Sequence, residues 1–179
     1  MNTKSKKALI VIDVQPAFLD DENRYIVDNI VRLLDHQHYD LYIEAAFHAE
    51  KGSIWDLQQH WTCPKGPETE TTPALRDRLV PREPLAVLKE TRSVFKGNAD
   101  LLKIFREKGI TEVHLVGLET NDCVLATAYE AFDLGFVPYV IEDCCETAST
   151  RKNLHELALT LLREQNMTKS LADLIGKQS

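Results

Sequence analysis

Short apolar runs alternate with segments of helical periodicity, and this alternation constrains the fold more than any other feature of the chain. The run at 8–14 (ALIVIDV) is almost wholly apolar, as expected of a strand buried on both faces of a sheet. Further strands are expected at 39–47, 85–89, 112–118 and 137–141, and helices at 28–34, 99–108, 123–134 and 153–163. This order predicts an α/β fold with three layers, α-β-α, around a mostly parallel, Rossmann-like sheet.

The chain has 179 residues and neither an internal repeat nor a long linker, so a single domain over 1–179 is expected. The formal net charge is -7, which disfavours nucleic acid as a partner because phosphate binding needs clustered Lys and Arg. The apolar runs are shorter than the roughly 20 residues of a membrane helix. The N-terminal residues lack the pattern of a signal peptide, and a cytoplasmic location is the resulting expectation.

The least regular part of the sequence is 49–84, which holds both tryptophans and most of the prolines. A loop of this length inside a compact domain is usually functional or partly structured. We interpret it as a segment that covers the substrate. The alternative is a packed excursion that touches no site.

Two charged residues stand at the ends of expected strands. Asp13 lies near the end of the first apolar run, where a buried carboxylate needs a partner or hydrogen bonds. Lys89 ends the strand at 85–89 and is placed to keep a neighbouring anion ionised. Taken singly, Asp13 could equally hold the following turn, and Lys89 could extend its amine into solvent.

Cys123 follows the strand at 112–118 after a short turn and stands where a helix is expected to begin. The N-terminus of a helix favours an anion, so we expect a lowered thiol pKa and a reactive thiolate. Backbone N–H groups at the same place are suited to bind an oxyanion. The alternative is a small buried side chain, the commonest environment of a free cysteine.

The three residues together carry more weight than each alone. Ligands of parallel α/β sheets bind outside the carboxyl ends of the strands. Asp13, Lys89 and Cys123 are all expected there and supply an acid/base, a cation and a thiol. This set is suited to covalent acyl transfer.

Three blocks of the sequence resemble the isochorismatase-like cysteine hydrolases, which include nicotinamidases and N-carbamoylsarcosine amidases. The blocks are ALIVIDVQPAF at 8–18, VLKETRSVF at 87–95, and GLETNDCVLATAYEA at 117–131 followed by GFVPYVIED at 135–143. They come in the family's order and together span most of the chain. The resemblance implies the isochorismatase-like fold and a hydrolase that acts on C–N bonds other than peptide bonds.

The resemblance also implies a role for each matching residue. Cys123 would attack the carbonyl carbon, Asp13 would act as general base and then acid, and Lys89 would stabilise the thiolate. A cis peptide bond is implied between Leu118 and Glu119, with the N–H groups of Glu119 and Cys123 directed at the oxyanion. Family members are commonly dimers or tetramers, so a homo-oligomer is expected.

The chain departs from the nicotinamidases of the family at their metal site. Those proteins bind zinc or a similar ion through an Asp-x-His pair and a further His, whereas this chain has Ala46 in the Asp position before His48. His60 follows at a longer spacing. We therefore expect no cofactor and no metal, and a small amide, ureide or carbamoyl compound as substrate. A metal-assisted, nicotinamidase-like amidase and a non-catalytic binding protein on the same fold are the alternatives.

Aromatic and cysteine residues complete the set of candidates. Phe18, Trp55, Trp61 and Tyr129 are expected to line the substrate pocket, although each could instead belong to the core or to a subunit interface. Cys63, Cys144 and Cys145 lack the spacing of a zinc site. A redox role for the adjacent pair Cys144 and Cys145 is a further alternative, without the usual Cys-x-x-Cys spacing.

Overall fold

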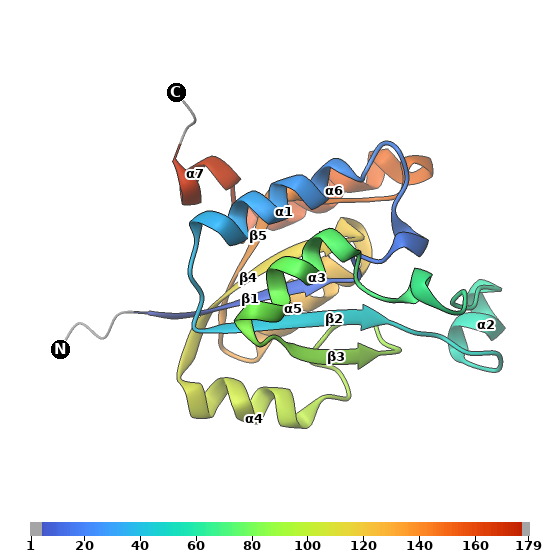
Figure 1. The fold of residues 1–179 in the computed structure, drawn as a ribbon, viewed down its shortest axis with the longest axis horizontal. Coiled ribbons are helices and arrows are strands. Elements are labelled where there is room, and N and C mark those ends of the chain that lie inside the picture. Colours follow the sequence, from blue (N-terminus) through green and yellow to red (C-terminus); the bar gives the residue numbers. More distant parts are fainter. Residues whose placement is uncertain (1–4, 177–179) are drawn as a thin grey trace.

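A six-stranded, wholly parallel sheet forms the centre of the protein in the computed structural model, which describes residues 5–176 (Figure 1). The strands lie in the order β3-β2-β1-β4-β5-β6. Their bounds are β1 Lys6–Ile12, β2 Leu41–Phe47, β3 Leu85–Lys89, β4 Ile110–Leu118, β5 Val137–Glu146 and β6 Thr168–Lys169. The mostly parallel sheet predicted from the sequence is confirmed, and every strand pair in it is parallel.

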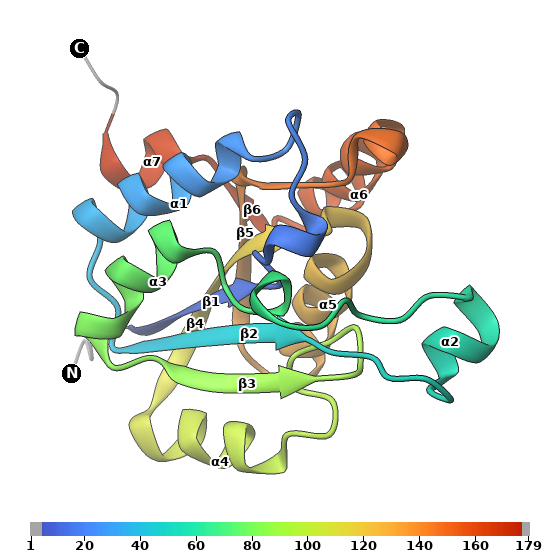
Figure 2. The same ribbon diagram turned by 45° about the vertical axis from the view of Figure 1, so that its right-hand side comes forward.

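Helices cover both faces of the sheet and give three layers. One face is covered by α1 (Tyr25–His36), α3 (Pro73–Leu79) and α7 (Leu171–Ile175), and the other by α4 (Ala99–Lys108), α5 (Leu125–Asp133) and α6 (Lys152–Glu164). The short helix α2 (Ile54–Gln59) stands apart from both layers, beyond the ends of β2 and β3 (Figure 2). The described residues also form four 3-10 turns, at Pro16–Phe18, Pro67–Thr69, Val80–Arg82 and Ser149–Arg151, and a π-helical turn at Thr120–Val124.

The apolar run of β1 feeds two separate hydrophobic cores. Ile10 and Ile12 pack in the core under α4, α5 and α6, whereas Leu9 and Val11 pack in the core under α1, α3 and α7. Successive side chains of a strand point to opposite faces. A strand covered on both faces must therefore be apolar at nearly every position, which explains why the run is continuous.

The centre of the sheet is also where the strand order reverses. β2 lies on one side of β1, and β4 lies on the other. In open α/β sheets the loops diverge at such a switch point and leave a crevice beyond the carboxyl ends of the strands. The segments after β1 and β4 hold Asp13 and Cys123, so the fold brings these two candidates to the crevice.

Several elements differ from the sequence prediction. β5 runs to Glu146 instead of ending at Ile141, so Cys144 and Cys145 lie inside a strand. Cys144 packs in one core and Cys145 in the other, so the two thiols point to opposite faces of the sheet. The irregular segment at 49–84 contains α2 and α3, and only α3 packs in the core, through two buried leucines. The short β6 and α7 were not predicted.

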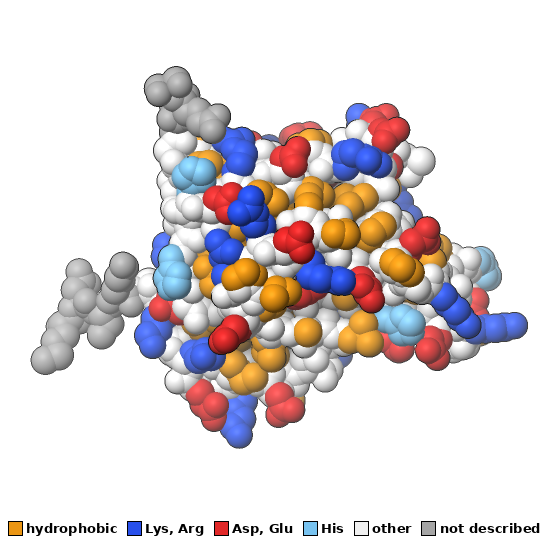
Figure 3. Space-filling model, in the orientation of Figure 1, with side chains coloured by type: hydrophobic (Ala, Val, Ile, Leu, Met, Phe, Trp, Pro, Cys, Tyr) orange, Lys and Arg blue, Asp and Glu red, His pale blue; other side chains and the backbone are white. Residues whose placement is uncertain are grey.

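None of the helices in the described residues combines the length and apolarity that crossing a membrane requires. Acidic and basic side chains are interspersed with apolar ones over the face shown in Figure 3. Lys and Arg do not gather into a single patch on that face.

Candidate active site

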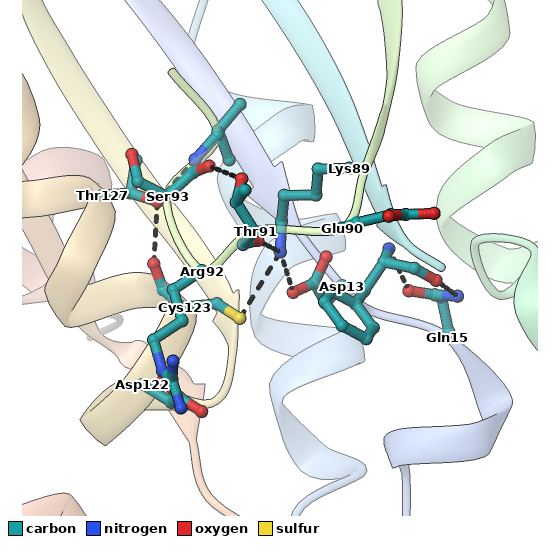
Figure 4. Close-up of polar contacts among 12 residues, drawn as sticks. Asp13, Gln15, Lys89, Glu90, Thr91, Arg92, Ser93, Asp122, Cys123 and Thr127 are labelled. Atoms are coloured by element: carbon teal, nitrogen blue, oxygen red, sulfur yellow. Dashed lines mark hydrogen bonds and ion pairs between the residues drawn. The ribbon is translucent and has the colours of Figure 1, made fainter. Parts of the chain in front are cut away.

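Asp13, Lys89 and Cys123 meet at the carboxyl end of the sheet (Figure 4). Asp13 directly follows β1, Lys89 is the last residue of β3, and Cys123 lies in the turn after β4. Lys89 Nζ donates hydrogen bonds to Asp13 Oδ2 at 2.7 Å and to Cys123 Sγ at 3.4 Å. Their exposed fractions are 2%, 3% and 8%, so the three groups interact with little screening by water.

Lys89 reaches Asp13 across an intervening strand. β2 separates β3 from β1, and neighbouring strands are about 4.8 Å apart, so the ammonium group spans roughly two strand spacings. On the way it passes Phe47, the register partner of Lys89 on β2, with Nζ 4.9 Å from the ring centroid. The carbonyl of Thr91 accepts a third hydrogen bond at 3.1 Å and helps to fix the amine.

Burial makes Asp13 a stronger proton acceptor than an ordinary carboxylate. It raises the pKa of Asp13 to about 6, although Lys89 opposes part of the rise. Oδ2 is bonded to Lys89, whereas Oδ1 is buried without a hydrogen-bond partner among the described residues. The side chain lines a cavity, so the unpaired oxygen is suited to receive a proton from a group bound there.

Cys123 differs from the prediction made for it. Burial, followed by the charge of Asp13, raises its thiol pKa well above the ordinary value, and Lys89 lowers it only in part. The expected lowering by a helix N-terminus is therefore wrong for the free protein. A π-helical turn at Thr120–Val124 precedes α5, and Cys123 lies within it. Because burial raises the pKa of the Cys123 thiol so far, the thiol keeps its proton at neutral pH, beside an ionised Asp13.

The backbone after β4 has an unusual conformation. The peptide bond between Leu118 and Glu119 is cis, as the resemblance implies. Gly117, just before it, has φ +120°, and a Cβ atom there would lie 2.0 Å from the carbonyl oxygen of Ile12. Only glycine lets β4 approach the end of β1 this closely. Thr127 Oγ1, four residues along the chain, donates a hydrogen bond of 2.7 Å to the Cys123 carbonyl.

A cavity of about 300 Å³ opens above Asp13 and Cys123. Four aromatic side chains form part of its wall: the ring centroids of Phe18 and Trp61 are 5.6 Å apart, and Phe47 packs edge-on against Trp55 with ring centroids 4.9 Å apart. The lining consists of Asp13, Phe18, Phe47, Trp55, Gln59, His60, Trp61, Arg92, Leu118, Glu119, Asp122, Cys123 and Arg151. A small, flat molecule is the kind of ligand that such a wall accommodates.

Three of the four predicted pocket aromatics, Phe18, Trp55 and Trp61, lie in this wall. Tyr129 does not line the cavity within the described residues. It lies on α5 and packs against the core under that helix, and its hydroxyl accepts a hydrogen bond from Gln165 Nε2 at 3.1 Å. The helix turns this side chain toward α6, away from the ends of the strands.

Sequence reasoning missed several residues of the site. Phe47 ends β2, and its position at the end of a predicted strand was a usable signal. Gln15 is fully buried and joins β1 to β2, because Nε2 donates to the Phe47 carbonyl at 3.1 Å while Oε1 accepts from the Phe47 N–H at 2.8 Å. Arg92 and Arg151 also line the cavity, and no local pattern in the sequence indicates that they would lie there.

A model of the isochorismatase domain matches residues 7–175. The chain belongs to the isochorismatase family. Among relatives, the uncharacterised isochorismatase family protein YwoC of Bacillus subtilis (strain 168) is 29% identical over 167 residues, 88% of this chain and 85% of YwoC.

Solved structures of the family share the fold. The nicotinamidase PncA from Bacillus subtilis superposes with a TM-score of 0.75 at 25% identity, covering 92% of this chain and 98% of PncA. A putative isochorismatase hydrolase from Oleispira antarctica gives a TM-score of 0.79 at 19% identity, over 99% and 100% of the two chains.

The histidines of this chain do not fit the metal site that the resemblance implies for nicotinamidases. His60 lines the cavity, but His48 does not, and its Nε2 lies 3.2 Å from Glu50 Oε1. Residues 5–176 hold no cluster of three or more His, Cys, Asp or Glu side chains suited to a metal ion. Ala46 offers no ligand where those proteins have a carboxylate.

Proposed function

We propose that this isochorismatase-family hydrolase cleaves a small amide, ureide or carbamoyl compound through a thioester on Cys123. The observation that carries the proposal is the position of Lys89 Nζ, in hydrogen-bond range of both Asp13 Oδ2 and Cys123 Sγ, whose side chains line a partly aromatic cavity. A base, a cation and a nucleophile in mutual contact match the requirements of covalent acyl transfer.

The first half of the reaction transfers the acyl group to sulfur. Asp13 accepts the thiol proton, and Cys123 Sγ attacks the carbonyl carbon of the substrate, which gives a tetrahedral oxyanion. We assign the N–H groups of Glu119 and Cys123 as its hydrogen-bond donors. Asp13 then returns the proton to the nitrogen as the C–N bond breaks, so that the amine or ammonia leaves and a thioester remains.

The second half regenerates the enzyme. Asp13 removes a proton from water, the resulting hydroxide attacks the thioester carbonyl, and the C–S bond breaks. The proton returns to sulfur as the acid product leaves. Lys89 stabilises whichever neighbour, Asp13 or Cys123, carries the negative charge.

Ammonia release from a panel of small amides and ureides tests the proposal, together with intact-mass measurement of the enzyme during turnover. We expect hydrolysis of at least one compound and an acyl adduct on Cys123. Cys123→Ala should abolish both. Cys63→Ala is the matched control, because this thiol donates a hydrogen bond to the Phe47 carbonyl and is not among the residues that line the cavity.

Activity that survives in Cys123→Ala would exclude the thioester mechanism. Binding of a panel compound without hydrolysis would favour the non-catalytic alternative. Hydrolysis that requires an added divalent metal ion would favour the metal-assisted, nicotinamidase-like alternative. A homo-oligomeric state and a cytoplasmic location stay predictions from the sequence.

A further inference from the structure

Arg92 is fixed in the wall of the cavity on two sides. Its Nε is hydrogen-bonded to Asp122 Oδ1, and its guanidinium carbon lies 4.6 Å above the centre of the Trp55 ring. Asp122 directly precedes Cys123, so the guanidinium group is anchored beside the nucleophile (Figure 4). Neither contact is required by the acyl-transfer chemistry of Asp13, Lys89 and Cys123.

The contacts with Asp122 and Trp55 leave the terminal nitrogens of the Arg92 guanidinium group available for a ligand. Among the described residues, Nε is the only Arg92 nitrogen with a hydrogen bond, so the N–H groups of both terminal nitrogens remain for a ligand. The side chain is about half exposed and lines the cavity. Two parallel N–H groups of a guanidinium match the two oxygens of a carboxylate, and a group already held in place loses little freedom on binding.

We propose that Arg92 is a specificity-determining residue that binds a carboxylate on the substrate while the scissile carbonyl lies at Cys123. This inference rests on the proposed function and narrows its substrate class to short amides or ureides that carry a carboxylate. The substrate is short because Arg92 and Cys123 line the same cavity, whose volume is about 300 Å³. The cavity also holds the carboxylates of Asp13, Glu119 and Asp122, so an anionic ligand needs a nearby cation to offset their repulsion.

Arg151 is the competing candidate in the same cavity. Its Nη1 is 3.1 Å from Glu119 Oε2, and no aromatic ring fixes its plane in the described residues. A group held on one side loses more freedom when it binds a ligand than a group held on two sides. Arg151 therefore serves as the comparison that tests the assignment to Arg92.

The test uses succinamate and its neutral isostere succinamide, which differ in one carboxylate. Their binding is measured by calorimetry in the Cys123→Ala background, where hydrolysis does not interfere. We expect succinamate to bind at least about tenfold more tightly, because hydrogen bonds between charged groups are stronger than those of a neutral amide. Arg92→Gln should remove the preference, and Arg92→Lys should restore part of it.

Two further variants serve as controls. Arg163→Gln removes the same charge from an arginine on α6 that pairs with Glu142 and Glu156 outside the cavity, and it should keep the preference. Arg151→Gln should keep most of it. Equal binding of the two compounds, no binding of succinamate, or a preference lost in Arg151→Gln but kept in Arg92→Gln would overturn the proposal.

Hydrolysis by the enzyme with Cys123 intact separates this inference from the proposed function. Charge-selective binding without release of ammonia from any amide would count against the proposed function and leave the role of Arg92 standing. Hydrolysis of succinamide in preference to succinamate would support the function and overturn the role of Arg92.

Discussion

Asp13 accepts a hydrogen bond of 2.7 Å from Lys89 through one carboxylate oxygen, while its other oxygen is buried without a partner in the described part of the chain. One oxygen thus holds the cation, and the other remains available for the proton that has to move. Removing either partner would leave an isolated charge in a nearly water-free site.

Lys89→Met should destabilise the protein strongly at alkaline pH. The variant leaves the Asp13 carboxylate buried without its cation, and breaking a buried pair costs about 3–5 kcal/mol. The loss should be smaller at pH 5, where Asp13 takes up a proton. Urea unfolding at pH 5 and pH 8 measures the difference. Lys103→Met, which breaks an exposed pair with Glu107, should change stability by less than about 1 kcal/mol at both pH values.

Asp13→Asn should alter the pH dependence of stability in a defined direction. Burial raises the pKa of Asp13 from 3.8 to about 6, so this group binds its proton more tightly in the folded state. Its contribution to stability is therefore complete below pH 3.8 and is lost as the pH rises through about 6. Relative to Asp13→Asn, the wild type should lose about 3 kcal/mol between pH 3.8 and pH 7. Parallel stability curves for the two proteins would contradict this expectation.

The rate of hydrolysis should have an acidic limb near pH 6. Asp13 must be ionised to accept the thiol proton, and its pKa is about 6, so kcat/KM should fall tenfold per pH unit below that value. Steady-state kinetics between pH 4.5 and pH 8 provide the measurement, with circular dichroism at each pH to show that the fold persists. A profile that stays flat down to pH 4.5 would exclude Asp13 as the base.

The four thiols should differ sharply in their reaction with iodoacetamide. Cys123 should react first, because it lines the cavity beside a base, and Asp13→Asn should slow it by about a hundredfold. Cys144 and Cys145 are fully buried, and burial raises the pKa of each thiol, so neither should react in the native protein. Peptide mass mapping after timed alkylation tests the order. A native disulfide between Cys144 and Cys145 would contradict their placement on opposite faces of β5.

Gly117→Ala should be far more damaging than Gly135→Ala. Both glycines have positive φ angles, but a Cβ at Gly117 meets the Ile12 carbonyl at 2.0 Å, whereas one at Gly135 meets nothing within 4 Å. We expect a loss of at least about 3 kcal/mol for the first variant and about 1 kcal/mol for the second. Thermal unfolding compares the two, and equal losses would show that the close approach to Ile12 is unimportant.

The sequence was sufficient to place Asp13, Lys89 and Cys123 together, because apolar runs mark the strands and parallel strands bring their carboxyl ends to one edge. The pKa of Cys123 could not be predicted in the same way. The helix terminus is a local feature, whereas burial and the charge of Asp13 come from the tertiary structure. Tyr129 was misplaced for a related reason, since the periodicity of a helix does not say which neighbour each face meets.

Arg92 shows a different limit of sequence reasoning. It stands three residues after Lys89 in a segment that was already singled out, yet its position depends on Asp122 and Trp55, which are distant in the sequence. The contacts of Arg92 with these two residues arise only in the tertiary structure. No local sequence pattern specifies them.

The position of β3 at the edge of the sheet has a consequence for how activity would be lost. An edge strand has hydrogen bonds to a neighbouring strand on one side only, so it separates more readily than the central strands. Lys89 belongs to this strand, whereas Asp13 and the turn of Cys123 follow central ones. Local opening of β3 would withdraw the cation while the other five strands stay assembled. Mild denaturant should therefore inactivate the enzyme before it unfolds the molecule.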